Sequence, residues 1–115
     1  MGKQNISLLA LPLLLSGAVA SSRFVTAAGA QAGAGANTFG VSRFAGVSGE
    51  RITTDVIGTA VVQVGAAVDK DATLKSDANG KAIAWETSGA KVAIALEAAT
   101  AADQFIEVLL IPNVA

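Results

Sequence analysis

Glycine divides this chain into apolar runs that are too short to form long helices. The 12 glycines separate segments that are rich in valine, isoleucine, threonine and phenylalanine. Short runs of β-branched and aromatic residues between turn residues are typical of strands. We therefore expect no helix longer than about three turns, and we expect strands over residues 23–26, 39–43, 51–57, 59–64, 91–97 and 104–111.

Turn residues between these runs predict how the strands connect. Asn79 and Gly80 lie between short apolar segments, a pattern that favours a hairpin with a two-residue type I′ turn. Gly58 is expected to make a bend or tight connection between the strands on either side of it, and Pro112 to end the last strand. Seven or eight short strands of this kind predict an all-β fold, a small barrel or sandwich.

The 115 residues leave room for one domain. We assign residues 21–115 to a β domain, with the apolar faces of its last two strands, at Ile94 and Ile106, forming the centre of the core. Residues 27–37, almost all alanine and glycine, are expected to be a low-complexity loop or hinge.

Residues 1–20 form an apolar N-terminal segment with three open interpretations. It is a first strand of the core, an arm that lies on a neighbouring molecule, or a secretory signal that is cleaved after Ala20. The apolar run is too short to span a membrane. We expect the segment to be retained and to contact a partner through the side chains Ile6, Leu8, Leu9, Leu11, Leu13 and Leu14.

The residues that most chemistry requires are missing from this chain. It contains no histidine and no cysteine, so the usual general base, thiolate nucleophile and zinc ligands are absent. Asp69, Asp71 and Asp77 do not match a calcium loop, and no phosphate-binding glycine motif is present. We expect no catalytic residue, cofactor or metal.

The charges of the chain argue against nucleic acid as a partner. The net charge of −1 lacks the basic excess that nucleic-acid binding needs. Its only arginines are Arg23, Arg43 and Arg51. They are either scattered surface charges or contacts to carboxylates of a partner protein, a role for which arginine is better suited than lysine.

Several segments, in order, resemble the capsid cement or head decoration proteins of tailed bacteriophages. They are RFV (23–25), GVS (40–42), GER (49–51), DVIGTAVVQVGAAV (55–68), SDANGKA (76–82) and AIALEAATAADQFIEVLLIP (93–112). The resemblance implies a non-enzymatic protein made in the host bacterial cytoplasm and located on the outer surface of the virion. It also implies a homotrimer that binds the major capsid protein where capsid subunits meet and stabilises the expanded head.

Two other functions remain open at this point. The signal-like start supports an exported surface or pilus-like subunit. A small glycan-binding β module is the third possibility, although a single tryptophan and the absence of tyrosine leave little aromatic surface for sugars.

Overall fold

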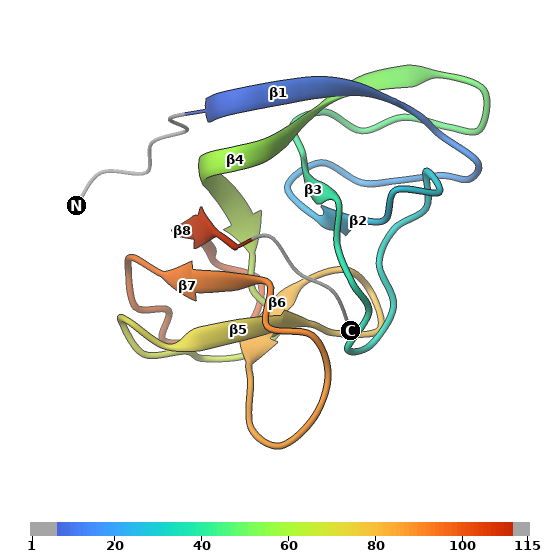
Figure 1. Ribbon diagram of the computed structural model, residues 1–115. Coiled ribbons are helices and arrows are strands. Elements are labelled where there is room, and N and C mark those ends of the chain that lie inside the picture. Colours follow the sequence, from blue (N-terminus) through green and yellow to red (C-terminus); the bar gives the residue numbers. More distant parts are fainter. Residues whose placement is uncertain (1–6, 112–115) are drawn as a thin grey trace.

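The computed structural model describes residues 7–111, and every regular element among them is a strand (Figure 1). The all-β prediction is confirmed. The eight strands are β1 (Ser7–Leu14), β2 (Phe24–Val25), β3 (Gly40–Ser42), β4 (Arg51–Gln63), β5 (Thr73–Ser76), β6 (Ala82–Ala84), β7 (Ala93–Ala95) and β8 (Phe105–Leu110).

The strands form one barrel-like antiparallel sheet, and its part from the second half of β4 to β6 is nearly closed. Their order is β2-β3-β4-β8-β7-β5-β6, and β1 pairs with β4 beside this path. A parallel bridge between Val64 and Ala82 brings the end of β4 next to β6. The Gly65 N–H donates to the Ala82 carbonyl oxygen there, at 2.8 Å. The first and last strands of the series β4-β8-β7-β5-β6 therefore lie next to each other.

The long strand β4 belongs to two parts of the molecule. Residues 51–57 lie between β1 and β3, whereas residues 59–63 pair with β8. Gly58, with a φ of 110°, lies where the pairing partner changes. Two strands were expected here, and the bend at Gly58 was predicted correctly, but the strand continues through it. We call residues 7–57 the N-terminal lobe and residues 58–111 the barrel.

Two groups of buried side chains stabilise these parts. The smaller core lies in the N-terminal lobe and consists of Leu13, Leu15, Val19, Val25 and Ile52. The larger core fills the barrel and extends to Phe24 and Val41.

One of the two isoleucines predicted at the centre of the core is placed differently. Ile106 is buried, but Ile94 is only half-buried. In β7 the small side chains of Ala93 and Ala95 face the interior, and both are fully buried. The alternation of β7 therefore points Ile94 to the outer face.

The predicted hairpin exists, with a different turn. Asp77 N–H donates to the Lys81 carbonyl at 2.8 Å, which leaves three residues in the loop. Gly80 has a φ of 75°, whereas the φ of Asn79 is not positive. This is a three-residue loop with one left-handed glycine, not a type I′ turn. The Asp77 carboxylate accepts the Asn79 and Lys81 N–H groups at 2.8 and 3.0 Å, which favours the longer loop.

The Ala/Gly-rich segment 27–37 is well fixed to the rest of the fold. Ala32 N–H donates to Phe24 O at 2.9 Å, and Gly35 N–H donates to Ser76 O at 2.9 Å. Gly35 O accepts the Ala90 N–H at 3.0 Å. The small side chains let this backbone lie directly against β2 and β5, so the segment connects the two parts rather than acting as a hinge.

A buried ion pair joins β4 to the residue that follows β3. Asp55 is only 2% exposed, and its carboxylate accepts a hydrogen bond from the Arg43 guanidinium, whose side chain is 35% exposed. Arg43 N–H also donates to Thr53 O at 3.1 Å. The carboxylate is thus almost removed from water, and Arg43 supplies its counter-charge.

The core assignment predicts different outcomes for two isoleucines. Ile106→Asp should prevent folding, because an unpaired charge buried in the barrel costs several kcal/mol. Ile94→Asp should leave a folded protein, since this side chain faces outward and reaches water. Thermal unfolding followed by circular dichroism tests both variants. A cooperative transition for Ile106→Asp would contradict the assignment of the core.

The ion pair gives a second prediction. Arg43→Met should lower the free energy of unfolding by about 3 kcal/mol, because it leaves the buried Asp55 carboxylate without a counter-charge. Adding Asp55→Asn to the same chain should recover much of that loss. Urea unfolding of both single variants and the double variant measures the coupling. Additive losses would show that the pair does not stabilise the fold.

Candidate partner-binding surface

Strand β1 is apolar on both faces, but the chain covers only one of them. The side chains of Leu8, Ala10, Pro12 and Leu14 lie on one face and are all exposed, Leu8 by 75% and Leu14 by 49%. On the other face, burial increases along the strand from Leu9, at 40%, through Leu11 to Leu13, at 6%. Strands that are apolar on both faces are usually covered on both.

One edge of β1 is also open over much of its length. Within residues 7–111, β4 is the only strand that pairs with β1. Thr53 directs its carbonyl toward Arg43, on the far side of β4. Pro12, the partner of Thr53 in β1, therefore directs its backbone away from β4. A residue without an N–H thus lies on the open edge, where it hinders pairing with another strand.

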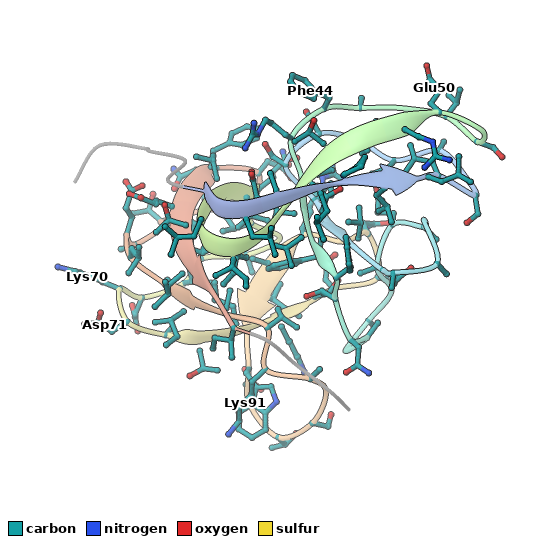
Figure 2. The ribbon with its side chains drawn as sticks, turned by 45° about the horizontal axis from the view of Figure 1, so that its top comes forward. Phe44, Glu50, Lys70, Asp71 and Lys91 are labelled. Atoms are coloured by element: carbon teal, nitrogen blue, oxygen red, sulfur yellow. The ribbon has the colours of Figure 1, made fainter. Side chains whose placement is uncertain are left out.

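The loop between β3 and β4 presents two further apolar side chains. Phe44 and Val47 are each 57% exposed, and Phe44 lies at the top edge of the molecule in Figure 2. The loop is held on both sides. Gly46 and Val19 exchange backbone hydrogen bonds of 2.9 and 3.0 Å, and Gly49 N–H donates to Leu15 O at 2.9 Å. The two side chains are therefore displayed on a fixed backbone.

The structure separates the apolar residues predicted to contact a partner. Ile6 lies outside the described residues. Leu8, Leu9 and Leu14 are exposed and Leu11 is half-buried. Leu13 is buried against the side chains of its own lobe, so its surface is already used within the chain.

The three arginines occupy three different environments. Arg43 belongs to the ion pair with Asp55. Arg51 is exposed at the start of β4, and its register partner in β1 is Leu14. The exposed face of β1 therefore ends beside a positive charge.

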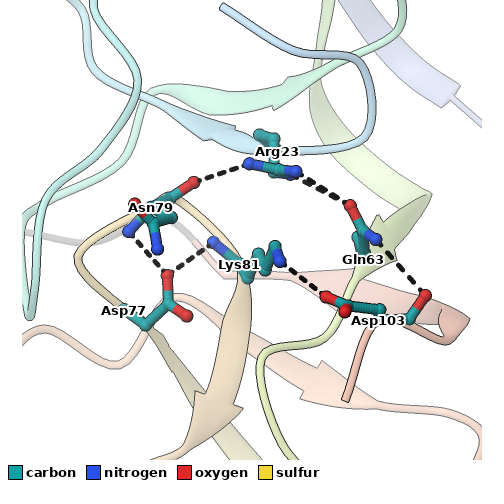
Figure 3. A network of polar contacts seen from close by, with 6 residues as sticks. All are labelled: Arg23, Gln63, Asp77, Asn79, Lys81 and Asp103. Atoms are coloured by element: carbon teal, nitrogen blue, oxygen red, sulfur yellow. Dashed lines mark hydrogen bonds and ion pairs between the residues drawn. The ribbon is translucent and has the colours of Figure 1, made fainter.

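Arg23 belongs to a polar network between the lobe and the barrel (Figure 3). Its guanidinium donates to Gln63 Oε1 at 3.0 and 3.2 Å and to the Asn79 carbonyl at 3.0 Å. Gln63 Nε2 in turn donates to the Asp103 carbonyl at 3.3 Å. Lys81 pairs with the Asp103 carboxylate, and its hydrogen bond and charge lower the pKa of that group. The network joins the loops at the ends of β4, β5 and β7.

Sequence reasoning did not identify Phe44 and Val47 as surface residues. Both lie in a loop between glycines and turn residues, where apolar side chains have little chance of burial. The aromatic residue Phe44 in a glycine-containing loop is the sequence signal that could have indicated an exposed contact residue.

Residues 7–111 contain neither a cluster of metal-binding side chains nor a membrane-spanning helix. In this range no three carboxylate, histidine or cysteine side chains lie together in a way that could hold a metal ion. The same residues include no helix that is long and apolar enough to cross a membrane.

The likeness to solved structures concerns the whole fold. The head fiber gp8.5 N base of bacteriophage phi29 superposes with a TM-score of 0.70 at 12% sequence identity. The match covers 90% of this chain and 94% of that one. At this identity the similarity shows a shared fold. No curated protein sequence matches the chain.

The sequence itself shows the family. Residues 4–110 match the family described as phage cement protein, which covers both the N-terminal lobe and the barrel. The resemblance in the ordered segments from Arg23 onward is therefore confirmed, and the match also includes β1. The chain belongs to the phage cement proteins, structural proteins of the virus head.

Proposed function

We propose that this protein binds the outer surface of an expanded phage head, at positions where capsomers meet, and stabilises the shell without catalysing a reaction. The observation that carries the proposal is the apolar surface that the chain itself leaves uncovered, on β1 and on the β3–β4 loop. Exposed apolar side chains that gather on one part of a small protein mark contact sites. The partner is the major capsid protein.

The similarity in fold supports a position on the head. The related structure is described as the base of a head fiber in phage phi29. A protein of the same fold thus serves there at a head. The exported or pilus-like alternative is not favoured, because the family match runs through the signal-like segment and joins it to the cement proteins.

Residues 43–50 are the part of the surface that we assign to the capsid. Phe44 is an exposed aromatic side chain on a backbone that hydrogen bonds hold in place. Aromatic anchors on preorganised loops carry much of the energy of protein interfaces, because little conformational entropy is lost on binding.

A homotrimer fits the symmetry of the proposed position. Three identical contact patches match three equivalent capsid subunits around a local threefold axis. Each contact can then be weak, since three linked contacts raise the total affinity by orders of magnitude. The shell gains stability because the bound protein favours its expanded form.

Head binding is the first test. The purified protein should bind undecorated expanded heads to saturation and raise the temperature at which they disrupt, whereas isolated capsid subunits should bind it poorly. Sedimentation with heads and calorimetry of the particles measure both effects. Equal binding to free subunits, or a saturating ratio that threefold positions cannot hold, would reject the proposal.

The loop assignment gives a separate prediction. Phe44→Ala should weaken head binding at least about tenfold, as expected for an interface anchor, and leave the fold and the oligomeric state unchanged. Thr87→Ala, in an exposed loop of the barrel, is the control and should bind like the wild type. Unchanged head binding by Phe44→Ala would remove the β3–β4 loop from the capsid contact.

A further inference from the structure

We infer that the exposed face of β1, with Arg51, binds the acidic end of the barrel of a second copy, so that protomers join head to tail. This inference rests on the proposed homotrimer and names the two surfaces that would build it.

The first of these surfaces is apolar and ends at a positive charge. Residues 4–22 contain no charged side chain. Leu8, Ala10, Pro12 and Leu14 form the exposed face, and Arg51 lies opposite Leu14 in the register. This combination fits a partner surface that has exposed apolar side chains with carboxylates beside them.

The charges of the chain are unevenly divided between its two parts. Residues 7–57 contain three arginines, Glu50 and Asp55, which gives a net charge of +1. Residues 58–111 contain four lysines and seven carboxylates, which gives −3. One internal pair in each part, Arg43 with Asp55 and Lys81 with Asp103, leaves this difference unchanged. The barrel of one copy therefore attracts the N-terminal lobe of another.

The turns after β4 and β7 gather carboxylates at one end of the barrel. Val68 and Ala99 form a bridge, and Asp71 N–H donates to Ala95 O at 2.8 Å. These contacts bring Asp69 and Asp71 to the end of the barrel where Glu97 follows β7. We call this region the acidic end.

Apolar side chains of β8 adjoin the acidic end. Glu97 accepts the Glu107 N–H at 2.9 Å. Phe105 and Leu109 lie on either side of Glu107 in β8 and are 42% and 41% exposed, whereas Glu107 itself is buried, at 2%. Asp69 and Asp71 are exposed, so the acidic end supplies the carboxylates and β8 the apolar side chains of the combination that the β1 face fits.

The two surfaces begin side by side and diverge along β1. Ser7 and Leu109 pair with the neighbouring residues Gly58 and Thr59 of β4, so the start of β1 lies near β8. Leu14 and Arg51 pair at the other end of β1. Figure 2 shows Glu50, the residue before Arg51, at the upper right of the molecule and Lys70 and Asp71 at its left. Different patches that bind each other between copies make a heterologous contact, which closes into a ring where the rotations between successive copies complete a full turn and otherwise extends into a filament. A second copy is therefore the occupant that this chain's own charges and apolar side chains fit.

A charge exchange tests the inference. Sedimentation equilibrium at about 100 µM, well above a micromolar dissociation constant, should show a trimer for the wild type. Arg51→Glu and Asp69→Lys should each raise the dissociation constant at least about tenfold, since each places like charges in contact. Both changes in one chain should restore trimers, because the contact again joins opposite charges.

Two further variants test the apolar part. Leu14→Asp should give monomers, whereas Thr87→Asp adds the same charge to an exposed loop and should leave the trimer intact. Both positions are exposed, so circular dichroism should show the wild-type fold in each case.

Several outcomes would overturn the inference. They are a monomeric wild type, a trimeric Leu14→Asp variant, or a double charge variant weaker than both single variants. Head binding is measured separately. Monomers that still bind heads would reject only this interface, and trimers that do not bind heads would reject only the proposed function.

Discussion

The bend at Gly58 is the constraint on which both parts of the molecule depend. Because β4 continues through the bend, its first half contributes Ile52 to the small core and its second half contributes Ala60 and Val62 to the barrel core. A residue with a Cβ is strained at the φ of 110° found there. The direction of β4 at this glycine therefore sets how the apolar lobe lies against the barrel.

Local patterns in the sequence predicted most strands, because β-branched runs and turn residues act over a few neighbours. They did not predict that the two expected strands 51–57 and 59–64 belong to one continuous strand. A glycine at position 58 is equally compatible with a bend inside one strand and with a turn between two strands. Ile94 was misplaced for a related reason. Alternation in β7 allows either face to be buried, and packing selected the small side chains of Ala93 and Ala95.

The candidate surface was predictable only in part. The leucines of β1 were visible as an apolar excess, but their division between core and surface depends on the register with β4, which places Leu13 inside and Leu14 outside. The roles of Arg43 and Arg51 also depend on the fold, because it is the pairing of strands that brings Asp55 beside Arg43 and leaves Arg51 exposed. The residue type alone could not show which of the two arginines forms an ion pair within the chain.

Pro12 bears on how the protein behaves at high concentration. An apolar strand with an open edge is a template on which identical chains can stack into continuous intermolecular sheets. Here the missing N–H interrupts the row of outward donors near its middle. The proline thereby opposes extension of the sheet through β1 and leaves the side chains of the exposed face as the surface through which another molecule can make contact.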